Sequence, residues 1–554
     1  MAGLKAAHNE ALKVKWPWGE AQAALYLALV ADKAKYPKAS ELFQQSLQVA
    51  KKTRLPFFIW QSYFHIGKRA LKDKNFPAAI KNLRDSISVI ESLRTKIDYD
   101  AQKTSFMGDK RQVYETMVFA LLNARDVQGA FEITEKAKSR ALVDLLSSKQ
   151  LGAQHAANVD PALLAREQQL FEQINALRNQ GGQKAETQLV PLEQEYKGVL
   201  GQIKLANPEL VSLKSVELAG LQQVQALLDD KTVLLEFLQA ENSLVVWLVT
   251  KNSIKAEQIL LSRKELADKV RAVRIMMSKP QLPAVYKLLG KLYVSLMDPF
   301  AKDIEGKNLV LVPDGPLHYL PFAALLDEEK KFLAVKHAIA YAPSANVLKY
   351  CVAKRRGGLN TILAFGNPDL GDAKLNLPNA ELEAKSIAKR FPKTRLYLRK
   401  EALETTGKET MGNFDIVHFA CHGEMDPVMP LLSCLRLAPD NINDGKLQAG
   451  EIFDMSLKAQ LVVLSGCETG LGKIASGDEI IGLTRGFLYA GAPSVMASLW
   501  KVDDNATSLL MTTFYENLPS AGKAEALRKA QLKIMQIKKH PYYWSSFFLV
   551  GDGK

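Results

Sequence analysis

The sequence predicts a helical N-terminal region followed by an α/β region with a largely parallel sheet. Up to about residue 150, apolar residues recur at spacings of three and four with few turn residues, which is typical of helices. From about residue 216, short β-branched runs alternate with helical stretches, which is typical of strands joined by crossover helices. We expect four segments: helices over 1–150, a linking helical hairpin over 151–215, and two α/β halves over 216–353 and 354–554.

Residues 1–150 contain an internal repeat. The segment from Tyr36 to Leu47 matches the segment from Phe76 to Ile87 in the positions of its proline, alanine, serine and apolar residues, and a shorter copy begins at Val127. The pattern resembles the tetratricopeptide repeat, a helix–turn–helix unit of about 34 residues. The copies here start 40 and 51 residues apart, which is longer than that period. A superhelical stack of repeats and an ordinary helical bundle are both compatible with it.

The linking segment and the α/β region differ sharply in composition. Residues 161–205 are rich in Gln, Glu and Leu, and Gly181-Gly182 breaks them into two arms, which indicates a helical hairpin. In the α/β region the apolar runs are continuous, as expected of strands covered on both faces. The predicted strands are 232–237, 244–249, 308–313, 361–366, 415–420, 460–465, 494–500 and 547–551.

The composition narrows the class of protein. The 554 residues are 47% hydrophobic and 24% charged, which is typical of globular chains. The net charge of +14 favours acidic partners, but no dense Lys/Arg tract has interleaved aromatic residues, so we expect no direct base-specific nucleic-acid binding. The four cysteines are too few for a disulfide scaffold, and no apolar run approaches the ~18 residues that span a bilayer. We therefore expect a soluble, reduced, cytoplasmic protein with no membrane partner.

Two of the predicted strands end in residues that can perform nucleophilic chemistry. His422 and Gly423 follow the strand at 415–420, and Gly466 and Cys467 follow the strand at 460–465. Catalytic groups in open α/β sheets gather at the carboxyl ends of the strands. A cysteine needs a base to become the attacking thiolate, and an imidazole can supply it. The pattern predicts a catalytic dyad with an oxyanion held by the backbone N–H groups of Gly423 and Cys467.

A metal site is the competing chemical interpretation, because His418, Cys421, His422 and Cys434 are all possible ligands. In an extended strand the Cα atoms of the two histidines would lie ~13 Å apart, at ~3.3 Å per residue, which is too far for one zinc ion. We therefore favour the dyad and expect no metal. Glycine motifs for phosphate binding are absent from the sequence, so no nucleotide or other cofactor is expected.

Several motifs in order along the chain resemble the CHAT domain, a relative of caspases and separase among the clan CD cysteine peptidases. These motifs are His418–Gly423, Leu464–Gly470, Gly477–Asp504 and His540–Gly551. The resemblance implies a caspase-like fold whose first half is an inactive pseudo-caspase. It also implies a cysteine endopeptidase whose dyad is His422 and Cys467, with Gly423 at the oxyanion position.

The resemblance also implies candidate substrate-binding residues. The strand that ends at Ser498 and Trp500 resembles the caspase strand that pairs with an extended substrate, and Trp500 is alternatively a core residue. Asp478 and Asp503 are acidic candidates for a substrate pocket. CHAT domains often follow tetratricopeptide repeats, as expected here.

The expected function is that of a partner-regulated cysteine endopeptidase that cleaves a protein substrate. The expected regulator is an activating protein or ribonucleoprotein bound to residues 1–150, because a repeat stack offers a large concave surface. Some CHAT proteins act with RNA-guided CRISPR effectors, and others cleave gasdermin-like pore formers in bacterial defence. The alternatives are a non-catalytic scaffold for protein interactions and a nucleic-acid-binding adaptor that uses the positive charge.

Overall fold

The chain forms two compact units, Met1–Leu218 and Ala219–Lys554. The computed structural model describes residues 1–94, 110–147, 220–426, 432–466, 481–500 and 504–554, together with scattered residues between 160 and 202. The first unit is helical, and the second combines helices with a mostly parallel sheet, which confirms the predicted fold class. The finer division into four segments stays a prediction. In the described part of the chain, no helix is long and apolar enough to cross a membrane.

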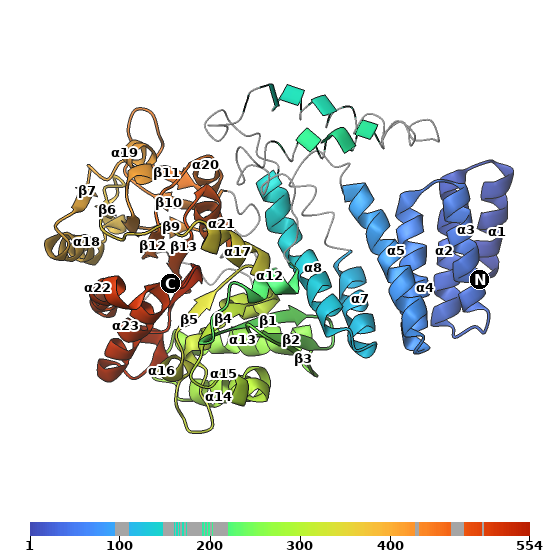
Figure 1. Ribbon diagram of the computed structural model, residues 1–554, viewed down its shortest axis with the longest axis horizontal. Coiled ribbons are helices and arrows are strands. Elements are labelled where there is room, and N and C mark those ends of the chain that lie inside the picture. The colour runs from blue at the N-terminus through green and yellow to red at the C-terminus, as the bar shows by residue number, and fades with distance from the viewer. Residues whose placement is uncertain are drawn as a thin grey trace. The chain divides into compact units, whose positions relative to one another are not determined.

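In the described part of the first unit, helices that follow one another directly are antiparallel and joined by tight turns (Figure 1). Prolines at the first positions of two helices start them, because proline lacks the N–H that would be unsatisfied there. The helices are α1 (Ala2–Lys13), α2 (Pro17–Lys33), α3 (Ala39–Lys52), α4 (Pro56–Lys72), α5 (Phe76–Arg94), α7 (Arg111–Asn123) and α8 (Val127–Ser147).

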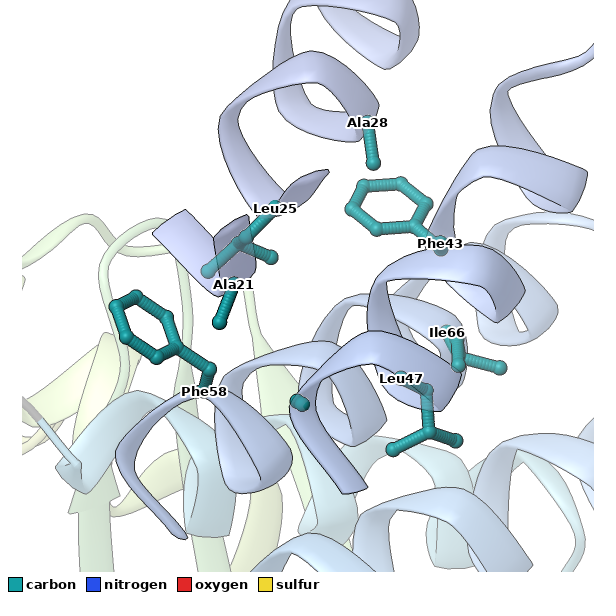
Figure 2. Close-up of a cluster of buried hydrophobic side chains, with 8 residues drawn as sticks. Ala21, Leu25, Ala28, Phe43, Leu47, Phe58 and Ile66 are labelled. Carbon is teal, nitrogen blue, oxygen red and sulfur yellow. The ribbon is translucent and has the colours of Figure 1, made fainter. Parts of the chain in front are cut away.

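The repeated residues form the core of the first unit. Each copy of the repeat starts the second helix of a pair, α3, α5 or α8. Phe43 and Leu47 of the first copy are buried against helices α2 and α4 in the cluster drawn in Figure 2. Leu83 occupies the position equivalent to Phe43 and is also fully buried. Gly67 is needed where α4 meets α5, because a Cβ atom there would lie 2.7 Å from Cγ of Leu83.

Buried serines tie neighbouring helices together. The hydroxyls of Ser46 on α3 and Ser62 on α4 lie 2.9 Å apart and share a hydrogen bond. The equivalent serine of the next copy, Ser86, donates to the backbone carbonyl of Trp60 at 2.8 Å.

In the linking segment, Arg166 and Glu195 form an ion pair between the two predicted arms, with Nε of Arg166 2.9 Å from Oε1 of Glu195.

The second unit is organised around an eleven-stranded sheet. The eight predicted strands are all present, and three further strands (β3, β5 and β7) complete it. Its spatial order is β3-β2-β1-β4-β5-β14-β13-β12-β8-β6-β7. The strands are β1 (Thr232–Gln239), β2 (Leu244–Val249), β3 (Ile254–Ile259), β4 (Asn308–Val312), β5 (Ile339–Tyr341), β6 (Ile362–Pro368), β7 (Thr394–Arg399), β8 (Ile416–Ala420), β12 (Leu461–Ser465), β13 (Ser494–Ser498) and β14 (Phe547–Gly551).

One continuous sheet runs through both expected halves. The C-terminal strand β14 lies between β5 of the first half and β13 of the second. It pairs in parallel with β5, where Val550 faces Tyr341, and antiparallel with β13. The expected boundary between the halves is fastened beside this strand, since Arg355 donates at 2.7 Å to the carboxylate of Asp552, the residue after β14.

Helices cover both faces of the sheet around β8. Successive strand residues point to opposite faces. His418 contacts Tyr515 of α22, whereas the next residue, Phe419, packs against Phe487 of α21. The longer helices of this unit are α13 (Arg263–Met277), α14 (Ala284–Leu296), α17 (Ala345–Ala353), α18 (Pro378–Arg390), α21 (Ile481–Ala490), α22 (Asp504–Ala521) and α23 (Lys523–Ile537).

Candidate active site

Three parallel strands, β6, β8 and β12, run in register toward one edge of the sheet. In the pairing registers, Gly366 of β6 lies beside Ala420 of β8, and Ala420 lies beside Ser465 of β12. The residues that follow them are Asn367, the Cys421-His422 pair, and Gly466. The candidate base, His422, therefore follows β8, which lies between β6 and β12 in the sheet.

The order of the strands reverses at this edge. From β6 the chain crosses to β7 on one side, and it then returns to form β8 on the other side of β6. Loops on either side of such a reversal diverge, and ligands of open α/β sheets bind in the crevice between them. The switch point therefore lies between the carboxyl ends of β6 and β8, where His422 follows β8.

Backbone hydrogen bonds hold His422 in place. The chain leaves β8 at Ala420 and enters the two-residue strand β9 (Gly423–Glu424), which pairs with β10 (Cys434–Arg436) in a small separate sheet. Between them, the His422 carbonyl accepts a hydrogen bond from the Arg436 N–H at 2.8 Å. His422 is thus fixed at both ends, by the large sheet and by the small one.

The His422 ring is oriented by a backbone carbonyl. Its Nε2 lies 2.8 Å from the carbonyl oxygen of Leu375, in the loop between β6 and α18. A carbonyl only accepts, so Nε2 carries the hydrogen, and in the neutral ring the lone pair is then on Nδ1. A base oriented by a third group is the arrangement that activates cysteine and serine nucleophiles. Leu375 was missed by the sequence analysis, because a backbone carbonyl has no signature in the sequence.

The candidate nucleophile follows a residue in an unusual backbone conformation. Cys467 itself lies outside the described residues. Gly466, which precedes it, has a φ of +90°. A Cβ atom on Gly466 would lie 3.2 Å from the Cys421 carbonyl oxygen, so the ends of β8 and β12 approach closely. Glycine is favoured at this position both for its backbone angle and for that approach.

His418 has different surroundings from His422. It is fully buried, its Nδ1 lies 3.0 Å from the Tyr515 hydroxyl, and its Nε2 lies 3.0 Å from a carboxylate oxygen of Glu383. Burial raises the pKa of Tyr515 well above its ordinary value, and the nearby Glu383 charge adds to the effect. The two imidazoles therefore have separate partners, one in the core and one at the strand edge.

The candidate substrate-binding residues are only partly described. Ser498 ends β13 and is buried beside Phe547 of β14. Trp500 is 8% exposed, and its indole N–H donates to the Tyr542 carbonyl at 3.1 Å. Most of the Trp500 ring is therefore buried in the core. Asp478 and Asp503 lie outside the described residues. The pairing of β13 with β12 ends at Met496, two residues before Ser498.

Two other cysteines are poorly suited to nucleophilic attack. Burial raises the pKa of Cys351 to about 12. Burial also raises the pKa of Cys434 to about 11, and the Glu424 charge acts in the same direction. Both thiols are therefore protonated at neutral pH, and the thiolate is the form that attacks.

The fold and this site define an α/β protein with an oriented imidazole at a strand-order switch. A family model described as the CHAT domain matches residues 286–552, which lie in the second unit. Two curated relatives are tetratricopeptide repeat protein 28 of Homo sapiens and of Mus musculus, each 27% identical over 332 and 333 residues. Each match covers 50% of this chain, and the chain spans 13% of the length of either relative.

Two solved structures show weak similarity to this chain. The Saccharomyces cerevisiae separase–securin complex matches 97% of this chain and 50% of that chain, with a TM-score of 0.43 and 10% identity. The complex of Porphyromonas gingivalis RgpB pro- and mature domains matches 52% of this chain and 76% of that chain, with a TM-score of 0.32 and 10% identity.

Proposed function

We propose that this protein is a cysteine endopeptidase whose base is His422 and whose nucleophile is Cys467. The observation that carries the proposal is the hydrogen bond of the His422 ring to the Leu375 carbonyl, at the edge where β12 leads to Cys467. The match to the CHAT domain supports it independently, because the resemblance of that domain to caspases implies this dyad.

The proposed reaction has two halves. Nδ1 of His422 takes the proton of the Cys467 thiol, and the thiolate attacks the scissile carbonyl carbon. The oxyanion is held by the backbone N–H groups of Gly423 and Cys467. The imidazolium then gives its proton to the leaving amine, which leaves a thioester on Cys467. A water molecule, deprotonated by His422, hydrolyses the thioester and restores the thiol.

The substrate is proposed to bind as an extended strand. Because the pairing of β12 with β13 ends at Met496, a substrate strand would lie beside residues 497–500, next to the dyad. Ser498 and Trp500 would then contribute backbone pairing and a wall of the pocket, while Asp478 and Asp503 would favour a basic side chain of the substrate.

Control of the enzyme is proposed to come from the helical unit. An activating protein or ribonucleoprotein would bind residues 1–150 and act through the linking segment 151–215. Large aromatic side chains on the first unit support a docking role, since Trp16, Trp18 and Phe57 are 55%, 43% and 39% exposed. Trp18 and Phe57 stack with ring centroids 5.8 Å apart, which joins the first turn of α2 to the first turn of α4 in one apolar surface.

The same exposed surface favours the second candidate, a non-catalytic scaffold in which repeats and a silent CHAT domain only bind proteins. The two candidates make opposite predictions about Cys467. Roles in bacterial defence and in the cytoplasm are proposed on the resemblance to CHAT proteins alone.

The test is to identify new protein N-termini when the full chain is combined with extracts and with the products of neighbouring genes. We expect cleavage products with the native chain and none with Cys467→Ala or His422→Ala. The matched control is Cys421→Ala, which removes a second cysteine at the same sheet edge, and we expect it to retain cleavage. Identical products from the native chain and Cys467→Ala would support the scaffold and refute the peptidase.

A further inference from the structure

Asn367, the residue before the last one of β6, has a backbone conformation that few residues adopt. Its φ is +50°, in the left-handed region that Asn tolerates better than most residues. It is 2% exposed, and it follows Gly366, which lies beside Ala420 in the sheet. Asn367 and Cys421 therefore occupy equivalent positions at the strand-order switch, each one residue beyond the paired residues Gly366 and Ala420.

The side chain of Asn367 directs its hydrogen bonds to one segment of the chain. Its Oδ1 accepts from the Leu377 N–H at 2.7 Å, and its Nδ2 donates to Asn376 Oδ1 at 2.8 Å and to Glu381 Oε2 at 3.2 Å. Arg399, at the end of β7, donates to the same Asn376 oxygen at 2.5 Å. The buried amide thus clamps the residues that lead into helix α18.

This clamp borders the residue that orients His422. Leu375 lies two residues before Leu377, in the short turn Ala373–Leu375, and its carbonyl accepts from Nε2 of His422. The Leu375 side chain is 36% exposed, so burial of that side chain does little to set the position of its carbonyl. The backbone after it is instead held by Asn367, through Leu377 and Asn376.

We infer that Asn367 is a positioning residue of the candidate dyad. It holds the Leu375 carbonyl where His422 Nε2 donates to it, and it thereby selects the imidazole tautomer whose lone pair is on Nδ1. This inference deepens the proposed function and rests on it for its catalytic meaning. Its physical content, the tautomer and orientation of one ring, does not depend on any substrate.

The test measures that tautomer in the full-length protein labelled with ¹⁵N-histidine. The spectrum of His422→Gln identifies the His422 signals by their loss. In the native chain we expect a protonated, pyrrole-type Nε2 and an unprotonated, pyridine-type Nδ1. In Asn367→Gly the left-handed backbone is retained but the clamp is lost, so we expect the two nitrogen signals to move toward each other as the tautomers mix.

Two further variants keep the result decisive. Asn443→Gly removes another loop-anchoring amide, which donates to the Thr405 hydroxyl, and we expect the His422 signals to stay unchanged. Asn376→Ala changes an exposed residue and removes one partner of the clamp, so we expect a smaller shift in the same direction as Asn367→Gly. If Asn367→Gly does not fold, the outcome for Asn376→Ala decides the question.

A native tautomer pattern in folded Asn367→Gly, even with a lower melting temperature, would overturn the inference and leave Asn367 a purely structural residue. That result would not affect the proposed peptidase, which is judged by cleavage with Cys467→Ala. Conversely, cleavage that persists in Cys467→Ala would remove the proposed function while leaving the measured orientation of His422 intact.

Discussion

Asp552 is the acid whose replacement we expect to destabilise the second unit most clearly. It lies just after β14 and is 2% exposed. Its carboxylate accepts from Arg355 at 2.7 and 2.5 Å, and it lies 3.2 Å from Nζ of Lys523. The Lys523 side chain is 3% exposed, whereas that of Arg355 is 37% exposed. Asp552→Asn keeps the shape and removes the charge.

The expected loss follows from the unequal burial of the two cations. Breaking a buried ion pair by removing one partner costs about 3–5 kcal/mol, because the remaining charge is buried without compensation. That cost applies to Lys523. The half-exposed Arg355 adds at most about 1 kcal/mol, since solvent screens it. We therefore expect Asp552→Asn to lower the unfolding free energy of the second unit by about 3–5 kcal/mol.

The assay is urea unfolding followed by near-ultraviolet circular dichroism, in which the midpoint falls while the slope stays constant. Lys523→Met in the Asp552→Asn background removes the stranded ammonium, so the double variant is expected to recover most of the loss. Glu329→Gln, which alters an exposed pair with Lys331, is the control and should not move the midpoint. A native midpoint for Asp552→Asn, or no recovery in the double variant, would refute the reasoning.

The same network predicts a dependence on pH. Burial by itself raises the pKa of Asp552, but the Arg355 hydrogen bond and the Lys523 charge outweigh it and hold that pKa below its ordinary value. A carboxyl group with a lowered folded-state pKa contributes stability that is complete above its unfolded pKa of about 3.9 and is lost as pH falls through the folded pKa. Asp552→Asn should therefore lose less stability in acid than the native chain does.

Three more variants test other parts of the structure. Gly466→Ala places a side chain on a residue whose φ is +90°, so we expect the free energy of unfolding to fall by about 1–3 kcal/mol and any cleavage to be lost. Native cleavage activity would contradict the tight turn. Tyr515→Phe leaves Nδ1 of His418 without its hydroxyl partner, so we expect the free energy of unfolding, measured in urea, to fall by about 1–3 kcal/mol. An unchanged free energy of unfolding would mean that this hydrogen bond is not formed. Ser62→Ala leaves the Ser46 hydroxyl of the first unit without its partner, so we expect a similar loss of stability, measured as a lower melting midpoint of the helical signal. An unchanged midpoint would exclude that hydrogen bond.

The elements that the sequence predicted well are those whose signals are local. The eight predicted strands are continuous apolar runs, and the observed bounds of each strand lie within one or two residues of the predicted bounds. The repeat was visible because Ala39 and Phe43 recur as Ala79 and Leu83, and these four residues are buried. His422 was found because a reactive residue follows a strand directly. Strand β7 was missed because Arg395 and Arg399 interrupt its apolar pattern.

The tertiary structure decided the relations between distant segments. The apolar runs mark where strands form, but the order of parallel strands depends on crossovers that sequence spacing leaves open. Hence the sequence predicted two α/β halves, while only the fold revealed that β14 joins them in one sheet. The orientation of His422 is a second example. It depends on the backbone carbonyl of Leu375, 47 residues away, and on the Asn367 amide that anchors the residues after it. Backbone carbonyls are identical along the chain, so folding alone determines which one meets the imidazole.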